Sequence, residues 1–150
     1  MTFNGLPLHP LVVHLTVVTL PVLVVLSLAS LHPRWRDRLR WPVVGMAVFA
    51  AVLVWFTVKT GESFENHSFS TPQGRASLKA HVDAATRLKW MTYGFALFSL
   101  VRFVLYDRPG WVRGALGVFV VAGAVALAYF TFQTGDAGAK HTYGCYYGHC

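Results

Sequence analysis

Polar residues interrupt this chain at intervals and leave four long apolar blocks between them. The blocks occupy residues 11–31, 41–58, 90–106 and 114–132. A helix that crosses the hydrocarbon core of a bilayer needs about 20 apolar residues, within a range of roughly 17–25. Each block lies close to or inside that range. The pattern therefore predicts an all-α integral membrane four-helix bundle with spans at about 9–31, 41–59, 82–106 and 112–133.

The composition agrees with a membrane protein. Of the 150 residues, 55% are hydrophobic and 13% are charged, whereas a soluble domain carries about 25% charged residues. This balance excludes a disordered chain, a collagen and a coiled coil. The length suits a single membrane domain over residues 1–150.

The basic residues indicate an orientation. The net charge is +7, but the basic residues sit at the ends of the predicted helices, which favours a membrane surface over nucleic acid as their partner. The short loop 32–40 holds four arginines, a density that is typical of the cytoplasmic side. We therefore expect both termini, an outer loop at 60–81 and an outer tail at 134–150 to lie on the opposite side. No Lys or Arg precedes Arg34, so we expect the first block to stay in the membrane and not to be cleaved as a signal peptide.

A repeated motif relates the two halves of the chain. Residues 55–62 read Trp-Phe-Thr-Val-Lys-Thr-Gly-Glu, and residues 129–136, which follow 74 positions later, read Tyr-Phe-Thr-Phe-Gln-Thr-Gly-Asp. The repeat predicts a bundle made of two repeated helical hairpins. We expect Thr60, Gly61, Thr134 and Gly135 to cap helix ends, because glycine tolerates the left-handed cap conformation and threonine hydroxyls bond to the preceding turn.

Small residues recur at four-residue spacing in the second and fourth blocks. Ala47 and Ala51 form one such pair, and Ala124 and Ala128 form another. Rows of small residues let helix backbones approach closely in lipid. We therefore expect these two helices to form the tight centre of the bundle.

Histidines provide the candidate chemistry. The chain has seven, and all but His32 fall at or beyond the predicted outer helix ends. Histidine is the commonest neutral metal ligand, and polar groups at membrane depth are costly and usually functional. The six outer histidines are His9, His14, His67, His81, His141 and His149.

Two of these histidines are the first candidates for cofactor ligands. His14 lies more than one turn inside the first span, where it needs a partner from another helix or a backbone carbonyl, so ligation, proton relay and a structural hydrogen bond all remain open. His81 stands at the start of the third span. We expect His14 and His81 to be the axial ligands of a b-type haem, with His9 and His141 in reserve.

The tail adds two cysteines, Cys145 and Cys150. On an oxidising outer face they would form a local disulfide, and the alternative is copper or zinc ligation with His141 and His149. His67 is a further metal candidate, although a hydrogen bond within the outer loop is the favoured role of His67 and His149. The sequence contains no P-loop, GxGxxG, HExxH or Ser/His/Asp arrangement, which favours a non-enzymatic role.

The opening of the chain resembles a known family. Residues 6–14 read Leu-Pro-Leu-His-Pro-Leu-Val-Val-His, which is similar to the L-P-x-H-P-x-x-V-H-F opening of a bacterial membrane family, domain of unknown function 2231. His81, the Thr60–Gly61 pair and the closing Thr-Gly-Asp-Ala-Gly-Ala of residues 134–139 with Tyr-Gly at 143–144 also resemble that family. The chain departs from the pattern at Leu15–Thr16, where Phe-Pro is usual, and in its cysteine-containing tail.

This resemblance implies a four-helix protein of the bacterial inner membrane. Some members of the family resemble fusions with Rieske iron–sulfur domains, which implies a small subunit of a respiratory or photosynthetic electron-transfer complex. Its partners would then be the lipid bilayer and other membrane subunits, such as cytochromes or iron–sulfur proteins, and not nucleic acid. Two alternatives remain: a cofactor-free structural accessory subunit, and an outer-face copper or zinc protein.

Overall fold

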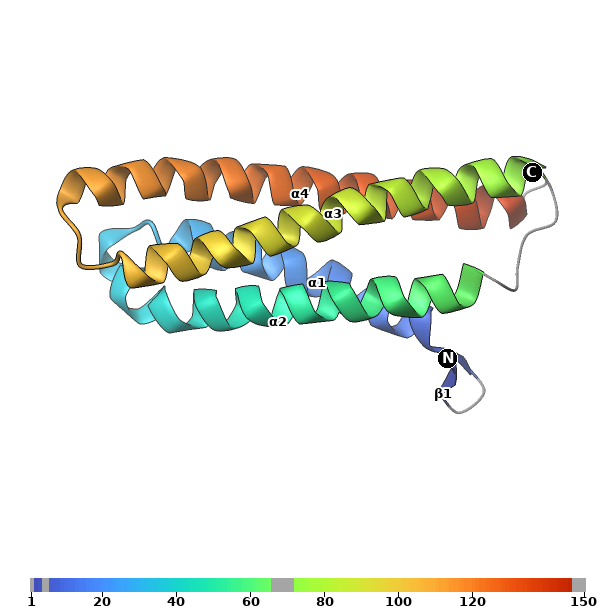
Figure 1. Cartoon of the computed structure of the whole chain (residues 1–150), viewed down its shortest axis with the longest axis horizontal. Helices are drawn as coiled ribbons and strands as arrows, with labels where there is room; N and C mark the ends of the chain where they lie inside the picture. The colour runs from blue at the N-terminus through green and yellow to red at the C-terminus, as the bar shows by residue number, and fades with distance from the viewer. Residues whose placement is uncertain (1, 4–5, 66–71, 147–150) are drawn as a thin grey trace.

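The structure, a computed structural model, describes residues 2–3, 6–65 and 72–146. Four helices make up nearly all of this part of the chain: α1 (Leu8–Ala29), α2 (Pro33–Glu65), α3 (Pro72–Val104) and α4 (Gly110–Tyr146) (Figure 1). Two short strands, β1 (Thr2–Phe3) and β2 (Leu6–Pro7), pair antiparallel ahead of α1. The expected all-α helical bundle is confirmed.

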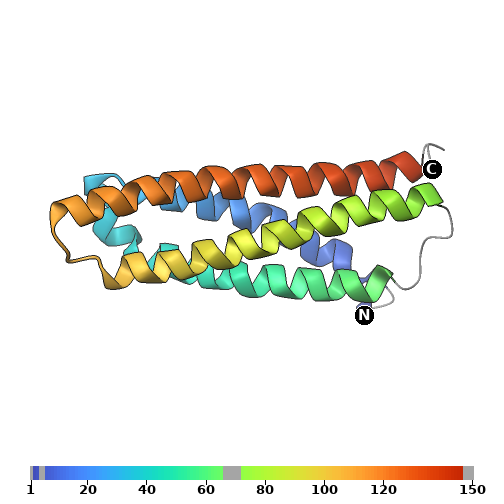
Figure 2. The same ribbon diagram turned by 45° about the horizontal axis from the view of Figure 1, so that its top comes forward.

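The helices form a closed ring in which each helix runs antiparallel to the next. Helix α1 contacts α2 and α4, and α3 likewise contacts α2 and α4 (Figure 2). Helices α2 and α4 therefore stand on a diagonal of the ring, so they do not by themselves form the tight centre that was expected of them. Their small residues pack into a core shared by all four helices instead.

The two ends of the bundle differ in chemistry. The α1–α2 and α3–α4 connections lie at one end, which we call the arginine end after Arg36, Arg102 and Arg113. Helix α1 begins, α2 ends, α3 begins and α4 ends at the other (Figure 1). We call this the histidine end after His9, His81 and His141.

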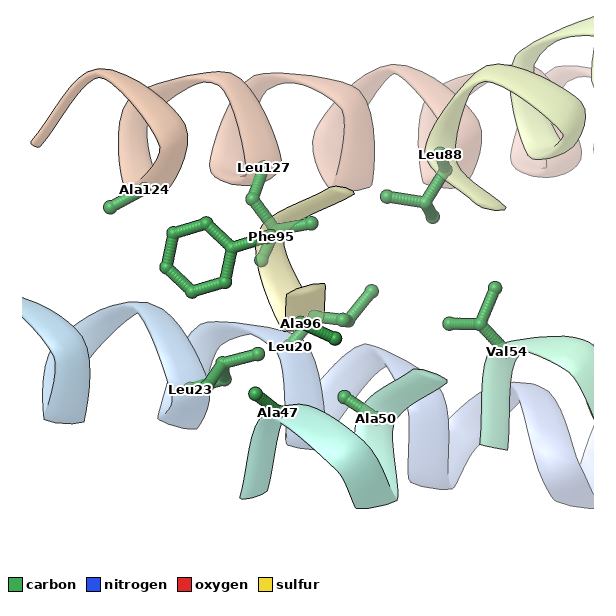
Figure 3. Packing of buried hydrophobic residues seen from close by; sticks show 10 residues of the cluster. All are labelled: Leu20, Leu23, Ala47, Ala50, Val54, Leu88, Phe95, Ala96, Ala124 and Leu127. Carbon is green, nitrogen blue, oxygen red and sulfur yellow. The ribbon is translucent and has the colours of Figure 1, made fainter. Parts of the chain in front are cut away.

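The core is small and the outer surface is apolar. Leu20, Leu23 and Leu127 are fully buried and pack with alanines and with Phe95 of α3 (Figure 3). Large apolar side chains such as Val104 and Phe132, each 76% exposed, point away from the bundle. A soluble protein would bury such side chains, whereas lipid solvates them. Helices α1, α2 and α4 are each long and apolar enough to cross a membrane.

Hydroxyl groups occupy the interior of the bundle. Thr16, Thr92 and Ser99 are buried, and each hydroxyl donates to the carbonyl oxygen one turn earlier in its own helix, at distances of 2.8 to 3.1 Å. An unpaired hydroxyl facing hydrocarbon would be costly. Placing these groups inside, with their hydrogen bonds made locally, leaves the lipid-facing surface free of them.

Helix α3 differs from the sequence expectation. It runs alongside its neighbours (Figures 1 and 2). By length and composition, however, it is not among the helices that are apolar enough to span a membrane. Its first half carries charges, and only the part between Lys89 and Arg102 is free of charged residues. The expected third span, 82–106, therefore coincides with α3 up to Val104 but is not apolar throughout. The charged residues of the first half are Arg75, Lys79, Asp83, Arg87 and Lys89.

The helices also extend past the expected spans at the histidine end. The outer loop expected at 60–81 is helical up to Glu65 and again from Pro72, and the expected tail is helical up to Tyr146. The helix caps expected at Thr60–Gly61 and Thr134–Gly135 are therefore wrong, because both pairs lie inside helices. A continuing helix satisfies its own backbone groups, so nothing forces it to end where the apolar block ends.

The absence of a side chain at Gly123 makes room for Phe95, the largest side chain of the core. An alanine Cβ at Gly123 of α4 would lie 2.8 Å from Cδ2 and 3.0 Å from Cε2 of Phe95. We expect Gly123→Ala to lower the free energy of unfolding by about 1–3 kcal/mol, the usual effect of overpacking a core. Unfolding of the full chain in detergent micelles, followed by circular dichroism, measures the change.

The matched control is Gly94→Ala in α3. No atom lies within 4 Å of an alanine Cβ at this position, and alanine favours helix over glycine by up to about 1 kcal/mol. The two substitutions should therefore change stability in opposite directions. Equal effects would contradict the packing of Phe95 on Gly123.

Candidate functional site

His9 joins α1 to α2 at the histidine end. Its Nδ1 lies 3.1 Å from the Thr57 carbonyl oxygen, which can only accept, so Nδ1 carries the proton. The Thr60 hydroxyl lies 3.3 Å from the same nitrogen and donates to the same carbonyl at 2.9 Å. The half-buried ring packs on Gly61, where an alanine Cβ would lie 3.0 Å from the imidazole Cε1. The absence of a side chain at Gly61 thus makes room for the imidazole.

His81 makes the same set of contacts between α3 and α4. Its Nδ1 donates to the Thr134 carbonyl oxygen at 3.2 Å. Its half-buried ring packs on Gly138, where an alanine Cβ would lie 3.0 Å from Cε1 and 3.1 Å from Nδ1. Each hairpin therefore holds one imidazole by a carbonyl oxygen and by a glycine four residues further along the same helix.

The structural repeat differs from the sequence repeat by one helical turn. The motif aligns Thr57 with Thr131 and Gly61 with Gly135, but His81 contacts Thr134 and Gly138. Gly135 has no atom within 4 Å of an added Cβ. The sequence analysis missed Gly138. The spacing Thr-x-x-x-Gly of residues 57–61 recurs at both 131–135 and 134–138, so the sequence carries no signal that selects Gly138 over Gly135.

The expected threonine back-bonds are confirmed even though the caps are not. The Thr60 hydroxyl donates to the Thr57 carbonyl oxygen, and the Thr134 hydroxyl donates to the Phe130 carbonyl oxygen at 2.8 Å. The Thr57 hydroxyl donates to Leu53 and lies 2.7 Å from the Thr16 hydroxyl of α1. The Thr57 carbonyl oxygen that orients His9 therefore also accepts a hydrogen bond from the Thr60 hydroxyl.

His141 lies near this pair. It is buried at 9% exposure, and its Nδ1 lies 2.7 Å from the Ser77 hydroxyl, so it connects α4 to α3. His9 and His81 are near enough to interact electrostatically, and so are His81 and His141. Three of the four candidate haem ligands thus lie in one region of the histidine end.

The fourth candidate, His14, has a different environment. It is exposed, and its Nδ1 bonds to the carbonyl oxygen of Pro10, one turn earlier in α1, at 2.6 Å. His14 therefore bonds within its own helix, whereas His9 contacts α2. Of the two imidazoles in the first span, His9 is the one that the fold places beside another helix.

The imidazole chemistry of His9 and His81 follows from their hydrogen bonds. Because Nδ1 donates to a carbonyl oxygen in both residues, the lone pair resides on Nε2, which is the tautomer that binds metals through Nε2. Such a second-sphere hydrogen bond also fixes the ring orientation. Both imidazoles therefore carry their lone pair on Nε2 and have a fixed ring orientation.

The structure does not place most of the remaining metal candidates. His67, His149 and Cys150 lie outside the described residues, and the disulfide between Cys145 and Cys150 stays a prediction. Within residues 2–3, 6–65 and 72–146, no group of three or more His, Cys, Asp or Glu side chains is arranged to hold a metal ion.

The fold and the site define an apolar four-helix membrane bundle with imidazoles gathered at one end. The chain belongs to the family described as predicted membrane protein (DUF2231), whose model matches residues 5–149. The resemblance seen in the opening motif is thereby confirmed. No curated protein and no solved structure matches the chain.

Proposed function

We propose that this protein is a small membrane subunit of an electron-transfer complex and that His9 and His81 are the axial ligands of a b-type haem. One observation carries the proposal: two imidazoles from two hairpins are oriented by the same kind of carbonyl bond and the same kind of glycine contact. This choice of ligands replaces His14 by His9, because His14 bonds within its own helix.

The donor set suits this cofactor. A bis-imidazole b-type haem takes its two axial ligands from histidines, and second-sphere hydrogen bonds from Nδ1 raise their basicity and fix their rings. The Thr57 and Thr134 carbonyl oxygens supply these bonds, and Gly61 and Gly138 leave space for the rings. When bound, the haem would supply one-electron transfer, which the surrounding apolar residues and hydrogen bonds would tune.

The same histidine contacts also support the cofactor-free alternative, in which they serve only to hold helices together. Each imidazole ties two helices of one hairpin together through a carbonyl oxygen, and His141 does so through Ser77. In an accessory subunit these bonds would serve assembly alone. The copper or zinc alternative would recruit His67, His149, Cys145 or Cys150 alongside His141.

We further propose that the arginine end faces the cytoplasm of a bacterial inner membrane. The support is the density of basic residues at that end, which is the feature that orients membrane helices during insertion. The histidine end, with both termini, then faces outward, and the partner cytochrome or iron–sulfur protein would dock there.

An absorption spectrum of the full chain, purified from haem-replete cells, tests the proposal together with metal quantification on the same sample. We expect a Soret band with the sharp α and β bands of a six-coordinate, bis-imidazole haem, and iron in proportion to protein. A colourless protein that has folded as a helical bundle overturns the haem proposal. Stoichiometric copper or zinc would then support the metal alternative, and no metal would support the accessory subunit.

A further inference from the structure

A cavity of about 180 Å³ opens at the arginine end, where all four helices begin or end. It lies between the end of α1, the start of α2, the end of α3 and the start of α4. A water molecule takes up about 30 Å³ in the liquid, so the space admits a phosphate-sized group with part of its hydration. The lining includes Ser30, Arg36, Arg102, Tyr106, Arg113 and Gly114.

Three arginines from three different helices converge on this cavity. Arg102 of α3 donates from Nη1 to the Ser30 hydroxyl at 2.7 Å and from Nη2 to the Ser30 carbonyl oxygen at 3.2 Å. Arg36 of α2 donates from Nε to the Tyr106 hydroxyl at 3.2 Å. These bonds hold two guanidinium groups at the cavity wall. Among the described residues, no side chain forms a hydrogen bond or an ion pair with the third, Arg113 of α4.

A fourth arginine lines an adjoining space of about 20 Å³, which shares Arg36 and Arg102 with the main cavity. The Arg40 guanidinium stacks over the rings of Phe103 and Tyr106 at 4.3 and 4.4 Å, and its Nη2 donates to the Phe103 carbonyl oxygen at 3.3 Å. Its Nε is buried and has no hydrogen-bond partner in the described part of the chain. Stacking therefore fixes this cation at the edge of the site.

Among the described residues, Asp37 is the one carboxylate that forms an ion pair with an arginine of this region. No carboxylate lines either cavity, and Arg36 acts repulsively on Arg102. Asp37 contacts the Arg36 Nε at 3.4 Å, but its side chain is 73% exposed and points out of the lining. Like charges held together in this way disfavour each other, and an anion between them relieves the repulsion.

Exposed tryptophans place the cavity at the depth of lipid headgroups. Trp35, Trp41 and Trp111 at this end are 50%, 70% and 78% exposed. Tryptophans of membrane proteins gather at the boundary between hydrocarbon and headgroups. A basic pocket between helices at that level is suited to the phosphate of an anionic lipid, because guanidinium groups form bidentate hydrogen bonds with phosphate oxygens.

We propose that the arginine end binds a phosphate group in this cavity and that Arg113 of α4 supplies a contact that the bundle itself does not use. An anionic phospholipid headgroup and free inorganic phosphate share this chemistry. The position of the cavity beside the exposed tryptophans favours the lipid.

The test compares three ligands on the delipidated full chain in detergent. Phosphatidylglycerol, phosphatidylcholine and inorganic phosphate are titrated separately, and native mass spectrometry gives the apparent affinity of each. We expect phosphatidylglycerol to bind most tightly and Arg113→Gln to weaken it by roughly fivefold or more, the effect of one basic residue on an anionic headgroup. Arg113→Lys keeps the charge but loses the bidentate guanidinium geometry. Its affinity for phosphatidylglycerol should lie between that of the unchanged protein and that of Arg113→Gln.

Arg108→Gln is the matched control. Arg108 is an exposed arginine at the same end, and it lines neither cavity. Its loss should leave the affinity within about twofold, because it removes only diffuse surface charge. Arginine-dependent binding of inorganic phosphate as tight as that of the lipid would also support the site and assign it to a soluble anion. Equal losses in Arg113→Gln and Arg108→Gln, or no loss in either, would overturn it.

Discussion

Replacing His81 by alanine is expected to remove the six-coordinate haem spectrum of the purified protein, either by loss of the Soret band or by its shift to that of five-coordinate haem, and replacing His9 should have the same result. In the proposed site each imidazole would supply one of the two axial bonds. Among the described residues, no other side chain of α1 contacts the Thr57 carbonyl and Gly61 as His9 does, and no other side chain of α3 contacts the Thr134 carbonyl and Gly138 as His81 does. A haem left with one axial ligand changes its spin state or dissociates. Absorption spectra and the haem content per chain measure the loss.

His14→Ala is the control that separates the site from histidine content in general. His14 is exposed and bonds only to the Pro10 carbonyl oxygen of its own helix, so its removal should leave the spectrum unchanged. Circular dichroism checks that all three variants are helical. Imidazole added to His81→Ala should restore part of the band by filling the vacated position. Loss of the band in His14→Ala with retention in His9→Ala would assign the ligand to His14 and contradict the site.

Gly138→Val is expected to displace His81 from its carbonyl partner. An alanine Cβ at this position would already lie 3.0 Å from the ring, and the two additional methyl groups of valine occupy the space that the imidazole fills. Overpacking of this kind lowers the free energy of unfolding by about 1–3 kcal/mol. Unfolding in detergent micelles gives the stability, and the absorption spectrum reports whether the haem site survives.

The control is Gly135→Val, three residues earlier in the same helix. It introduces the same β-branched side chain into α4, but no atom lies within 4 Å of a Cβ at Gly135. The difference between the two variants therefore isolates the contact with His81. If Gly135→Val were the more damaging, the site would follow the sequence repeat and not the register seen in the structure.

Much of the architecture could be predicted from the apolar blocks, because a membrane helix must satisfy its backbone internally and present apolar side chains to lipid. The limits of the helices could not. Gly61 and Gly135 follow apolar blocks, and glycine at such a position is typical of a helix end. Both residues nevertheless lie inside helices. Glycine suits a helix cap and a close packing contact equally well, and the sequence does not distinguish these uses.

The choice among the histidines was only partly predictable. Their concentration at one end follows from their positions relative to the apolar blocks. His81 was predicted as a haem ligand, and the structure places it against the Thr134 carbonyl oxygen of α4. His14 was preferred over His9 because it lies deeper in the apolar block. The rotation of α1 about its own axis decides otherwise, since it turns His9 toward α2 and leaves His14 exposed.

By itself, the sequence determined that this is an all-α membrane protein of two related hairpins with its imidazoles at one end, because hydropathy and position along the chain fix which segments meet lipid. Only the tertiary structure decided that His9 and His81 each rest on a carbonyl oxygen and a glycine, that Gly138 and not Gly135 serves the second hairpin, and that arginines from three helices surround one cavity. These features depend on the rotation and the axial offset of neighbouring helices, which side-chain packing sets and which a hydropathy pattern leaves open.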